Sequence, residues 1–190
     1  MSAGVSRTLA LRIGVLTLIV VFFQIGVVSE VPVFGVNAEL CALLVAFVGL
    51  LCGSITGAVV GFAVGLFIDL ALLQTLGLTS LIFTLIGYWC GRLRELRDPQ
   101  AGLTPLLVGV SASALALVGY SLMEFMLGVD APVSFQLLRV IVLGVVVNTI
   151  FALPMYALTR RALEGAMPED PRRRRRRAYT TGGLSPLSKA

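Results

Sequence analysis

The chain has 190 residues and a mean hydropathy of +0.97, with 57% hydrophobic and only 13% charged residues. A water-soluble surface cannot hold so large an apolar excess, and the net charge of +5 comes from basic residues gathered in a few clusters. We therefore expect an all-α polytopic membrane protein. The sequence contains no histidine, which excludes Ser-His-Asp and Cys-His catalysis, imidazole ligation of haem and HExxH zinc sites.

The first apolar run covers residues 9–28 and follows Arg7 and Arg12. A basic start before an apolar stretch is also typical of a secretory signal. However, no small-residue cleavage site precedes Glu30, and the sequence after it is equally apolar. We expect this run to be retained as a first membrane span.

The second apolar run, residues 40–73, is too long for one crossing. As a single helix it would be about 50 Å long at about 1.5 Å per residue, against a hydrocarbon core of about 30 Å. The sequence Gly-Ser-Ile-Thr-Gly at 53–57 offers a turn, because glycine relieves a tight bend near the interface. The run is therefore predicted to double back there as two short spans.

Three further runs, at about 77–90, 103–127 and 135–158, bring the predicted number of spans to six. Basic residues collect on the cytoplasmic flanks of membrane spans. With Arg7 inside, six spans place every one of the 15 basic residues in the cytoplasm except Arg139. We therefore expect a multi-pass membrane protein with both termini in the cytoplasm, made of a six-span domain at 1–166 and a tail at 167–190.

The tail is predicted to be a disordered cytoplasmic extension, since it passes from Pro-Glu-Asp-Pro through six arginines into a Gly/Ser/Thr/Pro-rich end. Each basic residue near anionic lipid contributes about 1 kcal/mol, so lipid contact is the expected role. Nucleic-acid binding is not expected, because no aromatic residues are interspersed among the arginines. The expected lipid contacts are Arg172, Arg173, Arg174, Arg175, Arg176 and Arg177.

Glycines recur every four residues in the second half of the long run, at Gly57, Gly61 and Gly65, and Asp69 continues the series. A step of four turns about 400° around a helix, so these positions stay on one side. Small residues at this spacing let two helix backbones approach closely in a membrane. The pattern predicts a helix-packing stripe, serving either an internal contact or a partner.

Asp69 is the only charged residue between Glu39 and Arg92. In the six-span arrangement Asp69, Glu124 and Arg139 lie at a similar depth near the outer surface. Charges in hydrocarbon cost a few kcal/mol each, so we expect these three to face the bundle, with at least one carboxylate paired to Arg139. Such a cluster would be either a structural clamp, a set of side chains reaching the headgroups, or a polar pocket open to the outside.

The stretch GAVVGFAVGLFIDLALLQTLGLTSLIFTLIGYWCGRL at 57–93 resembles the family of the rod-shape-determining protein MreD. Chain length and span number extend the resemblance to about residues 5–165, and the arginine-rich tail departs from it. The motif residues that carry the resemblance are Asp69, Gly77, Leu78, Gly87, Tyr88 and Gly91.

The resemblance implies a non-enzymatic scaffold in the bacterial cytoplasmic membrane. It implies a member of the cell-wall elongation machinery, which regulates cell shape and peptidoglycan synthesis without a cofactor. The implied partners are MreC, MreB, RodA and the transpeptidase that works with RodA. The resemblance also implies an architecture similar to the six-helix substrate-binding subunits of energy-coupling-factor vitamin transporters.

Two other functions stay open at this point. A substrate-binding membrane subunit of a vitamin or small-metabolite transporter would share the six-span plan and would need an outward-facing pocket, which the Asp69, Glu124 and Arg139 cluster could line. A membrane-embedded aspartyl enzyme is the third possibility. It would need a second facing aspartate, and no span supplies one for Asp69.

Overall fold

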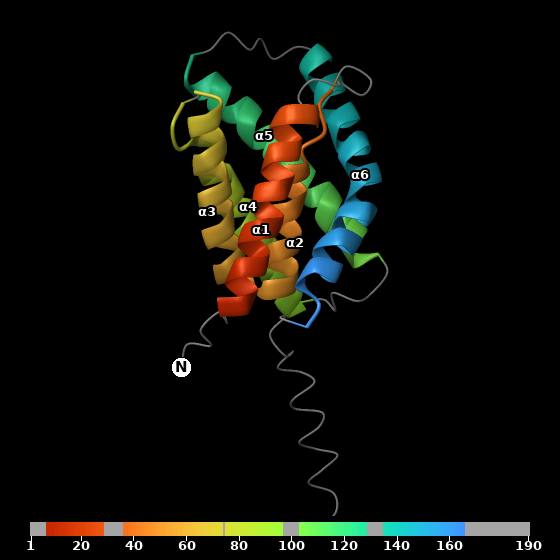
Figure 1. Cartoon of the computed structure of the whole chain (residues 1–190). Coiled ribbons are helices and arrows are strands. Elements are labelled where there is room, and N and C mark those ends of the chain that lie inside the picture. The colour runs from red at the N-terminus through yellow and green to blue at the C-terminus, as the bar shows by residue number, and fades with distance from the viewer. Residues whose placement is uncertain (1–6, 29–35, 74, 97–102, 129–134, 166–190) are drawn as a thin grey trace, which may run out of the picture.

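The computed structural model describes residues 7–28, 36–73, 75–96, 103–128 and 135–165, which form a bundle of helices (Figure 1). The predicted all-α class is confirmed. The elements, in chain order, are α1 (Arg7–Phe23), the π-helix η1 (Gln24–Val28), α2 (Leu40–Cys52), α3 (Ser54–Ala71), α4 (Leu78–Leu96), α5 (Thr104–Met126) and α6 (Phe135–Leu163).

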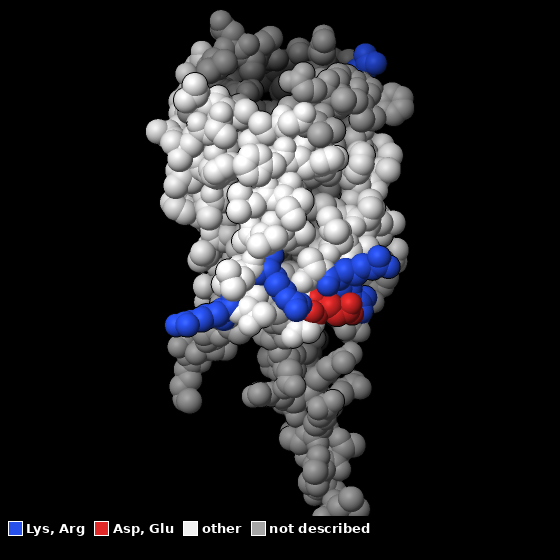
Figure 2. All heavy atoms as spheres, viewed as in Figure 1, with Lys and Arg blue, Asp and Glu red and all other residues white. Residues whose placement is uncertain are grey.

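Successive α-helices run in opposite directions, so the start of α1, the turn between α2 and α3 and the end of α6 all lie at one end of the bundle (Figure 1). We call this the arginine end. Figure 2 shows most of the basic side chains of this view in a band there, with one basic side chain apart at the opposite end. The described arginines of this end are Arg7, Arg12, Arg92, Arg94, Arg160 and Arg161. The opposite end, where α3 finishes and α4 begins, is called the Asp69 end.

The long apolar run does break, and it breaks at Gly53. This residue alone separates α2 from α3 and has a φ of +102°, a conformation that favours glycine. Its N–H donates to the carbonyl of Gly49 at 2.8 Å, and its own carbonyl accepts from the N–H of Gly57 at 2.9 Å. The backbone groups of Gly53 are thus satisfied within the turn itself.

Helix α2 is the centre of the bundle. All of its residues from Leu40 to Cys52 are buried, and it contacts each of the other five α-helices. Its 13 residues give a length of about 20 Å, shorter than a hydrocarbon core of about 30 Å. Because protein surrounds α2, its backbone ends are not left facing lipid tails.

Four helical segments are long and apolar enough to cross a membrane by themselves: Arg7–Gly26, Ser54–Ala71, Thr104–Met123 and Leu138–Leu163. The other two helices do not meet this standard alone, since α2 is short and α4 carries Arg92 and Arg94 near its end. The six predicted helices are present. That all six cross the bilayer remains a prediction.

Candidate functional site

Asp69 lies in the last turn of α3, with a fully buried side chain. Its carboxylate accepts a hydrogen bond from the backbone N–H of Gly77 at 2.8 Å and another from the N–H of Thr79 at 3.3 Å. These N–H groups belong to the start of α4. The N–H groups in the first turn of a helix have no carbonyl partner within the helix and carry partial positive charge. Asp69 therefore caps α4 from the neighbouring helix and closes the α3–α4 hairpin.

The turn that brings α4 under Asp69 depends on Gly77. This residue has a φ of +92°, which side chains other than that of glycine rarely adopt. The next residue, Leu78, packs its partly buried side chain against the core. The two residues together aim the first N–H groups of α4 at the carboxylate.

The glycine stripe lies in the contact between α3 and α4. A Cβ built on Gly57 would be 2.5 Å from the carbonyl oxygen of Gly87, and one on Gly61 would overlap the carbonyl of Phe83. At Gly65 a Cβ would overlap the backbone of Ser80. The two backbones are thus in direct contact along the stripe, which leaves these glycines no surface to offer to a partner.

Helix α4 contributes its own glycines to the same contact. A Cβ on Gly87 would overlap the carbonyl of Gly57, and one on Gly91 would overlap the backbone of Ser54. A Cβ added at Gly49 of α2 would also overlap the carbonyl oxygen of Gly87, so three helices meet here. Tyr88 differs, because it is 42% exposed and its ring lies 5.9 Å from the guanidinium of Arg92.

A second polar group, the Glu39 cluster, consists of Gln24, Glu39 and Asn148. The side chain of Gln24 donates to the carbonyl of Ala38 at 2.8 Å and accepts from the N–H of Leu40 at 2.9 Å. The N–H of Glu39 donates to Asn148 Oδ1 at 2.8 Å. Through these bonds η1 and α6 hold the start of α2.

The Glu39 cluster also contains polar atoms without hydrogen-bond partners among the described residues. These are Glu39 Oε2 and Asn148 Nδ2, both buried. Burial raises the pKa of Glu39 to about 7, because a carboxylate loses hydration there. Glu39 was not among the predicted site residues. The available signal was a carboxylate directly before an apolar run.

Of the predicted cluster of Asp69, Glu124 and Arg139, the structure describes the side chains of Asp69 and Arg139. Asp69 has its bonds to α4, Arg139 is exposed in the first turns of α6, and the described side chains include no ion pair between these two. Glu124 belongs to the last turn of α5, but its side chain lies outside the described residues. A pair between Glu124 and Arg139 therefore stays a prediction.

At the arginine end, Arg12 Nη1 donates to the carbonyl oxygen of Glu164 at 2.6 Å and so ties α1 to the end of α6. The predicted tail at 167–190, with its lipid-contacting arginines 172–177, lies outside the described residues. Its disorder and lipid contacts stay predictions.

A comparison with protein-family models decides the family. The model of the rod shape-determining protein MreD matches residues 6–162, which is most of the chain and covers the helices from α1 to all but the last residue of α6. The chain belongs to the MreD family. It is therefore a bacterial membrane protein of the Mre shape-determining system.

The residues that carry the MreD resemblance lie in one structural unit. Asp69, Gly77 and Leu78 form the capped turn, while Gly87 and Gly91 form the close contact of α4 with α3. In this member of the MreD family the motif thus corresponds to the α3–α4 hairpin.

No curated protein and no solved structure matches the chain in the corresponding comparisons. The expected similarity to energy-coupling-factor substrate-binding subunits receives no support from them and stays a prediction.

Proposed function

We propose that this MreD-family protein is a non-enzymatic membrane scaffold of the cell-wall elongation machinery, which regulates cell shape and peptidoglycan synthesis. The observation that carries the proposal is the family match over residues 6–162, together with the hairpin into which the motif residues fold. Asp69, the one acidic residue of the α3 stripe, is already occupied by two backbone donors. This occupation fits a structural role better than a catalytic one.

The orientation follows from charge. Cytoplasmic flanks of membrane spans are rich in arginine, so the arginine end faces the cytoplasm and the Asp69 end faces outward. Both termini then lie in the cytoplasm, and all six helices cross the membrane, with α2 surrounded by the other five.

A scaffold in a membrane holds its partners by lateral packing, since lipid tails and apolar side chains do not separate from one another. The α3–α4 unit is held by direct backbone contact, which makes it a rigid support. The partners are MreC, MreB, RodA and the transpeptidase of RodA, of which the membrane-spanning ones would contact the outer helices.

An affinity pull-down of the tagged full chain from mild detergent tests the scaffold. We expect MreC and RodA to come down with the chain, and cells depleted of it to lose rod shape. Rod-shaped growth after depletion, together with a pull-down free of elongation proteins, would refute the proposal.

One observation favours a second function, that of a substrate-binding subunit of a vitamin or metabolite transporter. Buried Glu39 Oε2 and Asn148 Nδ2 lack partners among the described residues, and unpaired buried polar atoms are what a small polar ligand would satisfy. Submicromolar binding of a vitamin to the purified chain, lost in Glu39→Gln, would favour the transporter subunit over the scaffold.

A further inference from the structure

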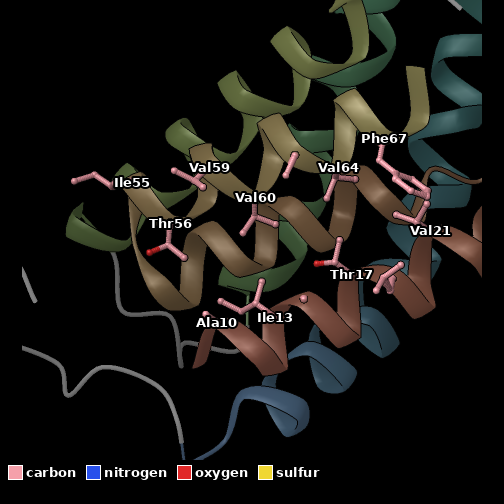
Figure 3. A pocket seen from close by; sticks show the side chains of 13 residues that line it. Ala10, Ile13, Thr17, Val21, Ile55, Thr56, Val59, Val60, Val64 and Phe67 are labelled. Atoms are coloured by element: carbon pink, nitrogen blue, oxygen red, sulfur yellow. The ribbon is translucent and has the colours of Figure 1, made fainter. Parts of the chain in front are cut away.

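An apolar groove runs between α1 and α3 on the flank of the bundle. It has a volume of about 550 Å³ and is lined by 13 residues of these two helices. Figure 3 shows side chains of the two walls facing one another across it, such as Ile13 and Val21 of α1 and Val60 and Val64 of α3. Thr17 and Thr56 are the only polar side chains among the lining residues.

The groove has the length of one membrane leaflet. Its α1 wall extends from Ala10 to Val21, a rise of about 16 Å at about 1.5 Å per residue. Half of a hydrocarbon core of about 30 Å is about 15 Å. The groove starts near the arginine end and reaches Val21 and Phe67, past the middle of α1 and α3, so its length matches that of one lipid acyl chain lying along the two helices.

The volume of the groove distinguishes between two possible occupants, a transmembrane helix and a lipid acyl chain. A helix about 10 Å across fills roughly 400 Å³ per turn, or about 1200 Å³ over three turns. The groove holds about 550 Å³ over that length, less than half of what an embedded helix needs. A slender hydrocarbon chain therefore fits this space better than a transmembrane helix of another protein.

A cationic side chain stands at the mouth of the groove. Arg7 lies one turn before Ala10 and shares a helix face with Ala10 and Gly14, because steps of three and four return to the same side. Its side chain is exposed and has no hydrogen bond or ion pair within the described part of the chain. Arg12, in contrast, projects to another side of α1 and bonds to Glu164.

We propose that the groove binds one acyl chain of an anionic phospholipid of the leaflet at the arginine end, with the lipid phosphate at Arg7. Arginine matches phosphate in charge and hydrogen-bonding geometry, and its long stem lets the guanidinium reach the headgroup level. The two walls supply the apolar contact, and Arg7 supplies the selection for negative charge.

Gly14 provides a way to fill the groove without disturbing the fold. A Cβ added at Gly14 meets nothing within 4 Å, so Gly14→Leu projects into open space in the groove. A Cβ added at Gly26 in η1 also meets nothing within 4 Å, but Gly26 does not line the groove. Gly26→Leu is therefore the matched control. Val59→Trp fills the groove from the α3 wall.

The test is native mass spectrometry of the purified full chain in detergent, titrated with phosphatidylglycerol or with phosphatidylcholine of the same acyl chains. We expect tight binding of one phosphatidylglycerol, weakened at least tenfold in Gly14→Leu and in Val59→Trp but not in Gly26→Leu. Arg7→Gln should lower the preference for phosphatidylglycerol about fivefold, the effect of one basic residue near an anionic lipid, while exposed Arg160→Gln should leave it unchanged.

Two results would overturn the proposal. One is wild-type phosphatidylglycerol binding in Gly14→Leu and Val59→Trp, with both variants monodisperse in gel filtration. The other is loss of a co-purifying membrane protein from these variants while lipid occupancy stays the same, which would make the occupant a partner helix. If one groove-filling variant does not fold, the other gives the answer alone.

Discussion

The carboxylate of Asp69 accepts the N–H of Gly77 at 2.8 Å, so the end of α3 directly caps the beginning of α4. This relationship accounts for a charge retained in the most apolar part of the chain. A carboxylate is the best acceptor for the first N–H groups of a helix, and its two bonds replace the hydration that it loses on burial.

Removing this cap should destabilise the protein. We expect Asp69→Ala to cost about 2–4 kcal/mol, because it deletes a buried acceptor and leaves two N–H groups unpaired. A chain of this size should then unfold about 5–10 °C lower in detergent. Asp69→Asn should recover part of the loss, and Thr75→Ala in the exposed turn should be neutral. An unchanged melting temperature in Asp69→Ala would show that the cap is dispensable.

The glycine stripe should not tolerate a side chain at its centre. A Cβ at Gly61 overlaps the carbonyl of Phe83, so even Gly61→Ala forces the two backbones apart, at a cost of about 1–3 kcal/mol. Gly61→Leu should abolish folded yield, measured by gel filtration of the detergent extract. Gly26→Leu, placed in open space, is the control. Normal folding of Gly61→Leu with loss of MreC from the pull-down would place the stripe in a partner interface instead.

The protonation of Glu39 should make stability depend on pH. Its pKa is raised by burial to about 7 in the folded state, against 4.5 ordinarily, so the folded state binds the proton more tightly than the unfolded state. The protein should therefore be most stable below about pH 4.5 with respect to this group, and should lose that stability as the pH rises to about 7. Glu39→Gln should melt higher than the wild type at pH 8 and show a flatter pH profile. Parallel profiles for the two proteins would mean that Glu39 is well hydrated.

Arg139 should be coupled to Glu124 but not to Asp69. The described side chains include no bond between Asp69 and Arg139, whereas the position of Glu124 in the last turn of α5 leaves it as the expected acidic partner. Double-mutant cycles with Arg139→Leu should give a coupling of up to about 1 kcal/mol with Glu124→Gln, the usual range for an ion pair that includes an exposed arginine. Coupling of Arg139→Leu to Asp69→Asn instead would indicate that Asp69 is the carboxylate that pairs with Arg139.

The helices were predictable because length and charge act strongly in a membrane. The run at 40–73 is longer than the bilayer is thick. Two spans in this run, but not one, place Arg92 and Arg94 in the cytoplasm, and this predicted the break that the structure has at Gly53. The central position of α2 could not be predicted in the same way. Its sequence is apolar all round, and hydrophobicity does not distinguish a helix surrounded by protein from one surrounded by lipid.

The candidate site was harder to predict because its partners are backbone groups. A search for charged partners of Asp69 leads to Glu124 and Arg139, whereas the acceptor is satisfied by N–H groups only eight and ten residues away. The sequence does contain a signal for this arrangement. Gly77 followed by an apolar helix marks a helix start that no Ser, Thr, Asp or Asn caps at the usual position.

The most direct test of the account is the side of the membrane on which each end of the bundle lies. Thr75→Cys, at the Asp69 end, and Leu103→Cys, at the arginine end, both replace exposed residues, while the three native cysteines are buried. With a membrane-impermeant maleimide, we predict labelling of Thr75→Cys in intact cells and of Leu103→Cys only after the membrane is opened. Labelling of Leu103→Cys in intact cells would contradict the proposed six crossings and the cytoplasmic position of the arginine end.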